Sequence, residues 1–347
     1  MSYVARWTRS LLLGLGLANL ATAAARTPVL GWFADRRRDA LAGAALSAAM
    51  AGSGPVSPWL LPLALPLQLA AASLRGLGYH PLRELAPGAP GVSAIELPTA
   101  DGHGLPALLI EPDQPSRGGL VICHGAGNDK TKYAWRMLNT LRAAGFTLIA
   151  IDLDGHGASR RRLSIPGVEH NVQLAVAWLR GRCPWVGLVG ISLGGAVAAR
   201  AVADGVQVDA LAVIESPAEL DLTTLSYQWP EFKGFLRLPF WRSADRVTPL
   251  QLLREWGGRM DTTHTMREIF DLLDLRGSLR RISTPTLLLY GVDDVIAPFG
   301  LIQPLLAELP RASLHLHRGT HLSLTMEEAP LADLAAWLVA ASADQPA

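Results

Sequence analysis

From residue 92 onward, short apolar runs alternate with stretches whose apolar residues recur at helical spacing. Two runs, at residues 93–97 and 105–110, flank a turn at residues 101–104 and predict a β-hairpin. Most of the later runs are almost entirely apolar, which is typical of strands buried on both faces of a parallel sheet. We predict these strands at residues 120–123, 146–152, 186–191, 210–214, 286–290 and 313–317.

Helical patterns fill several of the intervals between these strands. They lie at residues 132–144, 168–180 and 193–203. Strands that alternate with helices predict an α/β fold, with a mostly parallel sheet and helices on both of its faces. The interval between Glu215 and Thr284 has no strand pattern but contains many aromatic side chains. Because an insertion of this size needs a fold of its own, we predict a helical cap at about residues 218–280, before the penultimate strand.

Residues 1–90 follow a different pattern and form a hydrophobic N-terminal extension. A charge-free stretch at residues 10–25 follows two arginines and ends in small residues, which is the layout of a secretory signal. A second charge-free stretch, at residues 40–74, is long enough to cross a bilayer. Three prolines spaced four residues apart interrupt it, and each removes a helical hydrogen bond.

Three interpretations of this extension are open: a membrane-associated helix pair, a cleaved signal followed by a stalk, and a soluble Ala-rich helical extension. We favour the first, which makes the protein membrane-associated through residues 1–90. The other two would leave it secreted or cytoplasmic. Prolines and glycines near residues 81–91 then indicate a linker into a second domain at residues 91–340, followed by a tail at residues 341–347.

Composition narrows the range of functions. The 347 residues include 31 basic and 30 acidic side chains, so there is no basic excess to neutralise the phosphates of a nucleic acid. A hydrophobic fraction of 50% excludes a disordered chain. Two cysteines, Cys123 and Cys183, are too few for a disulfide framework or a four-cysteine zinc site.

A candidate nucleophile lies where a predicted buried strand ends and a helix begins. The segment Gly190-Ile191-Ser192-Leu193-Gly194 has the G-x-S-x-G pattern of a nucleophile elbow. In such an elbow a strained turn exposes the serine hydroxyl, and the glycines avoid clashes with neighbouring backbone. The start of the following helix also offers backbone N–H groups to a developing oxyanion.

A nucleophilic serine needs a histidine that accepts its proton near neutral pH and a carboxylate that orients the histidine. His321, after the last predicted strand, is the candidate base. For the acid we favour Asp294, after the penultimate strand, while Asp293 and Glu215 remain alternatives. We interpret four other histidines as solvated or structural: His103, His170, His264 and His315.

The order Ser192, Asp294, His321 is that of the α/β-hydrolases. Residues 92–340 resemble the branch of this superfamily that includes monoacylglycerol lipases and serine aminopeptidase-like hydrolases. The resemblance is carried by five blocks, at residues 121–130, 152–159, 190–195, 291–298 and 319–321.

The resemblance also implies the oxyanion hole. The block His124-Gly125-Ala126-Gly127 would supply the N–H of Ala126, and the residue after the nucleophile would supply the N–H of Leu193. His124 would then be a structural turn residue. The motif glycines of these blocks are Gly125, Gly190 and Gly194.

These features predict a serine hydrolase that cleaves carboxylic esters through an acyl-enzyme, without cofactor or metal. Aromatic residues of the predicted cap favour a small-molecule ester with an apolar acyl group. An acyltransferase or an aminopeptidase would use the same three residues. The aminopeptidase would also need an acid that binds a free amine, such as Glu219, Asp221 or Glu231. A non-catalytic interaction protein with an α/β-hydrolase-like fold is the alternative outside enzymes.

Overall fold

The computed structural model describes residues 3–25, 45, 48–49, 51, 88–131, 136–220, 260–321 and 324–343. The described residues fall into two separate units, one near the N-terminus and one that begins at residue 88. The first contains the helix α1 (Tyr3–Ala25). Here Arg9 Nε donates a hydrogen bond to the carbonyl of Ala51 at 2.8 Å, and the Ser10 hydroxyl donates to the carbonyl of Arg6 at 2.9 Å.

The membrane expectation for residues 1–90 finds no support in the described residues. None of the described helices, α1 included, is both long enough and apolar enough to cross a bilayer. The second apolar stretch, at residues 40–74, lies outside the described residues except at 45, 48, 49 and 51.

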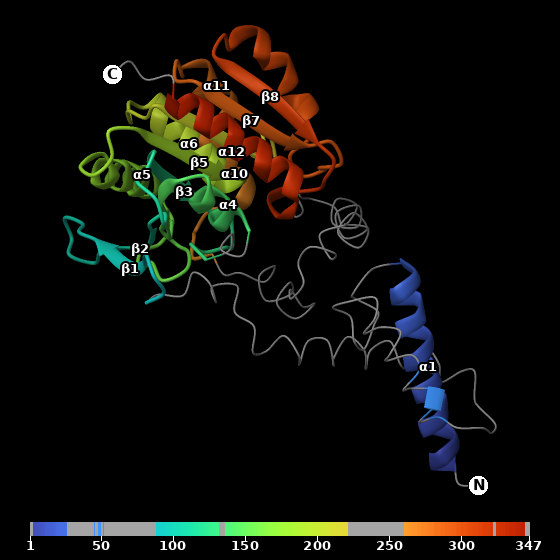
Figure 1. The fold of residues 1–347 in the computed structure, drawn as a ribbon. Helices are drawn as coiled ribbons and strands as arrows, with labels where there is room; N and C mark the ends of the chain where they lie inside the picture. The colour runs from blue at the N-terminus through green and yellow to red at the C-terminus, as the bar shows by residue number, and fades with distance from the viewer. Residues whose placement is uncertain are drawn as a thin grey trace. The chain divides into compact units, whose positions relative to one another are not determined.

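The second unit is built on one eight-stranded sheet in the order β1-β2-β4-β3-β5-β6-β7-β8 (Figure 1). Strands β1 and β2 form the predicted antiparallel hairpin, β2 also runs antiparallel to β4, and all other neighbours are parallel. The strands are β1 (Val92–Leu97), β2 (Leu105–Ile110), β3 (Gly118–Cys123), β4 (Phe146–Ile151), β5 (Val186–Ile191), β6 (Ala210–Ile214), β7 (Thr286–Gly291) and β8 (Ala312–His317). The prediction of a mostly parallel α/β sheet is confirmed.

Helices cover both faces of this sheet. They are α4 (Met137–Ala143), α5 (Ile165–Arg180), α6 (Leu193–Ala203), α10 (Met266–Leu273), α11 (Leu275–Arg280) and α12 (Glu328–Ala343), with 3-10 turns η4 (Phe299–Leu301), η5 (Gln303–Glu308) and η6 (Leu324–Met326). Helices α5, α6, α10 and α11 lie on one face, and α4 and α12 on the other.

Successive strand residues feed these two faces in turn. Val121 packs in the cluster beneath α5 and α6, whereas its neighbour Leu120 packs in the cluster beneath α4 and α12. Strands β3, β5, β6 and β7 are buried at every position. A strand buried on both faces must be apolar throughout, and this is why the continuous apolar runs located these strands.

Local capping fixes where several helices start. Ser164 precedes α5, and its hydroxyl accepts the N–H of Gly167. Thr265 and Glu268 form a capping box at α10, in which each side chain accepts the backbone N–H of the other residue. The predicted helix at 193–203 has the bounds of α6. Helix α4 begins at Met137, after its N-cap Arg136, and so is shorter than the predicted helix at 132–144, of which residues 132–135 lie outside the described residues.

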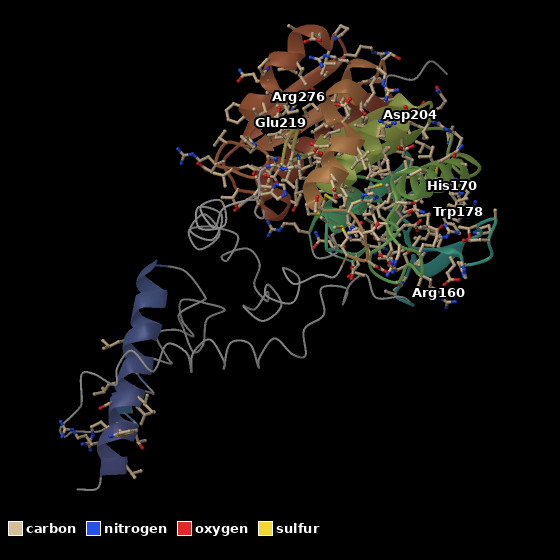
Figure 2. The ribbon with its side chains drawn as sticks, turned by 180° about the vertical axis from the view of Figure 1, so that it is seen from behind. Arg160, His170, Trp178, Asp204, Glu219 and Arg276 are labelled. Atoms are coloured by element: carbon tan, nitrogen blue, oxygen red, sulfur yellow. The ribbon has the colours of Figure 1, made fainter. Side chains whose placement is uncertain are left out.

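The predicted cap at 218–280 stays a prediction, since residues 221–259 lie outside the described residues. The described part, α10 and α11, packs against α6 and so belongs to the layer that covers the sheet. On α11, Arg276 forms an ion pair with Glu219 at 2.6 Å, which ties this layer to the segment after β6 (Figure 2).

Candidate active site

Ser192 lies in a sharp turn between β5 and α6. Its φ of 52° and ψ of −117° lie outside the usual regions for a residue with a side chain. The Ser192 N–H donates to the carbonyl of Ile214 at 2.8 Å, and its carbonyl accepts the Ser216 hydroxyl at 2.8 Å. Bonds to the neighbouring strand end therefore hold the strained turn, whose cost is about 1–3 kcal/mol.

The glycines on either side make this turn sterically feasible. A Cβ at Gly190 would lie 2.3 Å from the carbonyl oxygen of Gly194. A Cβ at Gly194 would lie 2.3 Å from the carbonyl oxygen of Cys123 and 2.6 Å from that of His124. Neither approach leaves space for a side chain, so the elbow requires glycine at both positions.

A single imidazole joins the serine to a carboxylate. His321 Nε2 lies 3.0 Å from Ser192 Oγ, and His321 Nδ1 lies 2.9 Å from Asp294 Oδ2. Because the carboxylate accepts from Nδ1–H, the other ring nitrogen is left to accept the serine proton. The three predicted side chains thus meet at the carboxyl ends of β5, β7 and β8.

Asp294 is held firmly in this orientation. Its side chain is fully buried, and its second oxygen accepts the backbone N–H groups of Ile296 and Ala297, both at 2.8 Å. Its neighbour Asp293 is exposed, with its N–H donated to the carbonyl of Gly319 at 3.0 Å. The structure therefore pairs His321 with Asp294 and not with Asp293.

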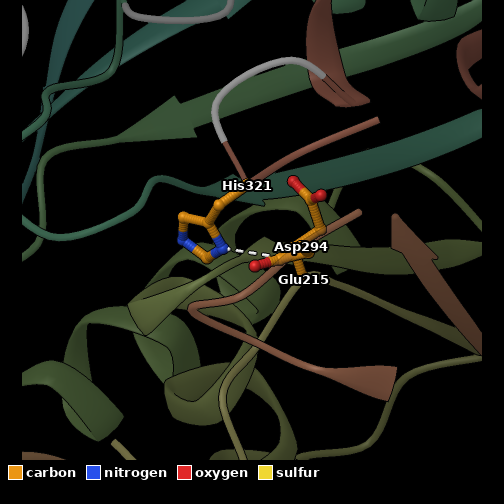
Figure 3. Close-up of side chains that lie close together, drawn as sticks. All are labelled: Glu215, Asp294 and His321. Carbon is orange, nitrogen blue, oxygen red and sulfur yellow. Dashed lines mark hydrogen bonds and ion pairs between the residues drawn. The ribbon is translucent and has the colours of Figure 1, made fainter. Parts of the chain in front are cut away.

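Glu215, the other alternative acid, lies beside the pair. It is fully buried at the end of β6, and ligand atoms of Glu215, Asp294 and His321 lie within 4.8 Å of one another (Figure 3). These donors could hold a divalent ion only if His321 or Asp294 gave up their mutual hydrogen bond. From the sequence, Glu215 was an alternative to Asp294 as the acid that pairs with His321. In the structure Asp294 forms this pair, and Glu215 lies beside it as a second buried carboxylate.

The two residues expected to form an oxyanion hole come from neighbouring segments. Leu193 is the first residue of α6, and Ala126 lies in the turn after β3, where Asn128 N–H donates to the carbonyl of Gly125 at 3.2 Å. The close approach of Gly194 to the carbonyls of Cys123 and His124 packs this turn against the start of α6. Both segments therefore border Ser192.

The histidines nearest to this turn are structural. His124 Nε2 accepts the N–H of Leu153 at 3.1 Å, so its Nδ1 donates to the carbonyl of Gly125 at 2.8 Å. Burial lowers the pKa of His124, and burial is also the main cause that lowers the pKa of His156 to about 4. The rings pack edge to face with centroids 4.9 Å apart. Both stay neutral near pH 7.

A buried ion pair that the sequence did not indicate organises the loops below the site. Asp152, at the end of β4, accepts Lys130 Nζ at 2.6 Å and the Lys130 and Ala158 backbone N–H groups at 2.7 Å each. Gly157, with a φ of 51°, leaves space for this carboxylate. The sequence shows only an aspartate directly after an apolar strand, and it does not indicate that Lys130, in another loop, is the partner of Asp152.

The fold agrees with comparisons to known proteins. A profile described as the alpha/beta hydrolase family matches residues 120–337. This chain belongs to the alpha/beta hydrolase family. The family assignment confirms the resemblance inferred from the five sequence blocks, and it covers the parts that contribute Ser192, Asp294 and His321.

Within this family, two relatives are pimeloyl-(acyl-carrier protein) methyl ester esterases. The one from Nitrosomonas europaea is 30% identical over 224 residues, which are 57% of this chain and 85% of the relative. The one from Photorhabdus laumondii is 28% identical over 227 residues, 58% of this chain and 83% of the relative. The monoacylglycerol lipase structure from Paleococcus ferrophilus has a TM-score of 0.54 at 22% identity, over 68% of this chain and 99% of the lipase. At that identity the likeness concerns the fold alone.

Proposed function

We propose that this member of the alpha/beta hydrolase family is a serine hydrolase that cleaves carboxylic esters. Ser192 is the nucleophile, His321 the general base and Asp294 the residue that orients the base. The observation that carries the proposal is the single imidazole whose two nitrogens lie 3.0 Å from Ser192 Oγ and 2.9 Å from Asp294 Oδ2. Hydroxyl, imidazole and buried carboxylate in this arrangement form the constellation for acyl transfer.

In the first half of the reaction, Ser192 Oγ attacks the ester carbonyl while His321 Nε2 accepts its proton. Asp294 stabilises the imidazolium that forms, and the N–H groups of Ala126 and Leu193 hold the oxyanion. Loss of one such donor costs about 2.7–4 kcal/mol in comparable sites. The imidazolium then gives its proton to the departing alcohol oxygen as the C–O bond breaks.

In the second half, water replaces the alcohol. His321 accepts a proton from the water, whose oxygen attacks the carbonyl of the acyl-enzyme. The bond to Ser192 Oγ then breaks, and His321 returns the proton to the serine. The reaction needs no cofactor in this mechanism, because every proton and electron pair moves between substrate, water and these side chains.

Ester hydrolysis is favoured over the other reactions by two observations. Two relatives, 30% and 28% identical to this chain, are named as methyl ester esterases. An aminopeptidase needs an acid free to bind an amine, and Glu219 already pairs with Arg276. The other two acids considered, Asp221 and Glu231, lie outside the described residues. We further propose that the substrate is an ester with an apolar acyl group, which the aromatic residues of the predicted cap would bind.

Labelling with a fluorophosphonate tests the nucleophile. We expect one stoichiometric adduct on the intact chain, abolished in Ser192→Ala and unchanged in Ser93→Ala, whose serine is exposed on β1. Labelling of Ser192→Ala at the rate of the unsubstituted chain would refute the proposal. The substrate class is then tested with p-nitrophenyl esters of increasing acyl length, for which kcat/KM should rise beyond acetate.

A further inference from the structure

Glu215 is a buried acid that the mechanism above does not use. It directly follows β6 and is fully buried, and its N–H donates to the carbonyl of Leu289 on β7 at 2.9 Å. A carboxylate oxygen of Glu215 lies within 4.8 Å of a ring nitrogen of His321 and of a carboxylate oxygen of Asp294 (Figure 3). Glutamate is almost never fully buried unless it is paired, so a buried glutamate at this place points to a role in the site.

The backbone at Glu215 has an unusual conformation. Its φ of 47° lies in the left-handed region, which residues with a side chain rarely adopt. Among the described residues other than glycine, only Ser192 and Asp274 share a positive φ. Such strain gathers at functional sites, and here it occurs at two strand ends beside the same imidazole.

The loop that leads to Asp294 leaves space for the Glu215 side chain. A Cβ at Gly291, the last residue of β7, would lie 3.0 Å from Glu215 Oε1 and 2.4 Å from the carbonyl oxygen of Gly319. Gly319 stands two residues before His321. The carboxylate therefore lies between the segments that carry Asp294 and His321, where salt and water screen its charge only weakly.

We propose that Glu215 is a positioning residue for ester hydrolysis, whose carboxylate charge stabilises the imidazolium that His321 becomes when it accepts the Ser192 proton. This inference rests on the function proposed above. An opposite charge within about 4–6 Å favours the charged form of a titratable group by about one to three pH units. Asp294 orients the ring through Nδ1, and Glu215 adds a second negative charge beside it.

Protons at this site distribute over two carboxylates and one imidazole. The carboxylates repel each other, and imidazole is more basic than a carboxyl group by about two pH units, so a proton drawn here binds to His321. Tyr290 of β7 lies behind these acids and donates its hydroxyl to the carbonyl of Ser216 at 2.7 Å. Burial, with the charges of Asp294 and Glu215, raises the pKa of Tyr290, so this phenol stays neutral during the test.

The pH dependence of kcat/KM for a p-nitrophenyl ester tests this role. In Glu215→Gln, a neutral change of similar shape, the acidic limb should move to lower pH by about one unit or more, because the imidazolium loses a stabilising charge. The maximal kcat should fall by about tenfold, which corresponds to one pH unit. Glu215→Asp keeps the charge and should keep the limb within about half a unit. Asp293→Asn removes an exposed carboxylate and should leave the limb unchanged.

A merely structural role for Glu215 would lower the rate or the stability without moving the limb. The inference is therefore overturned if the acidic limb of Glu215→Gln coincides with that of the unsubstituted chain while circular dichroism shows a folded variant. Glu215→Met is a second neutral variant for the case in which Glu215→Gln does not fold, and it should move the limb in the same direction.

A readout without substrate separates this inference from the proposed function. Nuclear magnetic resonance of the full chain with isotope-labelled histidine follows the protonation of His321, whose signal is assigned by its loss in His321→Ala. The midpoint should lie at lower pH in Glu215→Gln than in the unsubstituted chain. A midpoint that moves supports the coupling of Glu215 to His321 even if the labelling of Ser192 fails. A midpoint that stays in place while Ser192 is labelled overturns the coupling alone.

Discussion

Asp294 and Asp293 are adjacent in sequence but have opposite surroundings. Asp294 is buried against His321, whereas Asp293 points to solvent. An amide at position 294 can donate to His321 Nδ1 and so favours the wrong tautomer for accepting the serine proton. This difference gives the site a matched pair of substitutions.

We therefore expect Asp294→Asn to lower kcat for ester hydrolysis by about 10⁴-fold, with little change in melting temperature. Steady-state kinetics on a p-nitrophenyl ester measures it. Asp293→Asn places no amide N–H next to the His321 ring, so it should keep kcat within about twofold of the unsubstituted value. Equal losses in the two variants would contradict the assignment of Asp294.

Gly194 tests the packing of the elbow against the turn after β3. A Cβ there would meet two backbone oxygens at 2.3 and 2.6 Å, which cannot move as a side chain can. Gly194→Ala should lower the free energy of unfolding by about 1–3 kcal/mol and reduce fluorophosphonate labelling, because Leu193 and Ala126 move apart. Gly300→Ala, whose added Cβ would have no heavy atom of a non-neighbouring residue within 4 Å, should change neither.

Urea unfolding measures the stability of both glycine variants, and timed labelling measures the reactivity of Ser192. If Gly194→Ala were as stable and reactive as Gly300→Ala, the elbow would not pack against this turn.

At the scale of elements, loops after the strands build the site, and a buried charge pair holds two of those loops together. Lys130 and Asp152 side chains are 16% and 0% exposed, whereas Arg280 and Glu308 are 47% and 51% exposed. Removing the partner of a buried charge is far more costly than breaking an exposed pair. The two ion pairs should therefore differ in how much their loss lowers the free energy of unfolding.

Lys130→Met should accordingly lower the free energy of unfolding by about 3 kcal/mol, because the buried Asp152 loses its cation. It should also lower kcat, since the loop that contains Ala126 loses its anchor. Arg280→Met should cost no more than about 1 kcal/mol and leave kcat unchanged. Chemical denaturation and ester kinetics check both variants, and similar losses of stability in the two would contradict this account.

The elements of the sheet could be predicted because burial leaves a local pattern. Central strands such as β5 are apolar throughout, and Ser192 with its glycines marks the start of α6. The bounds of helix α12 were not predicted, since its Ala-rich sequence lacks the contrasting polar face that reveals a helical period.

Most contacts between side chains of remote segments could not be predicted from the sequence. The order Ser192, Asp294, His321 follows a known chain order, and this made the site predictable. The contact of His315 and His317 with Asp333, the pair of Lys130 with Asp152 and the position of Glu215 have no such order. They depend on which loops meet after folding, which no short-range pattern encodes.

At the scale of the whole α/β domain, two neutral histidines are buried beneath the site. His124 and His156 are each 1% exposed, and burial lowers the pKa of both. For His156 the pKa is about 4 in the folded chain against 6.5 when unfolded. Between pH 4 and pH 6.5, His156 is therefore protonated in the unfolded chain and neutral in the folded chain. The stability is therefore fully present above pH 6.5 and is lost as the pH falls towards 4.

From this linkage, His156 alone should lower the free energy of unfolding by about 2 kcal/mol between pH 7.5 and pH 5, at about 1.4 kcal/mol per pH unit below 6.5. Urea unfolding at the two pH values measures the decrease. His156→Gln cannot titrate, so its decrease should be about 2 kcal/mol smaller than that of the unsubstituted chain, whatever the substitution costs at pH 7.5. His170→Gln, at an exposed position on α5 (Figure 2), should show the full decrease. A decrease in His156→Gln equal to that in His170→Gln would mean that buried His156 does not set the acid sensitivity of this domain.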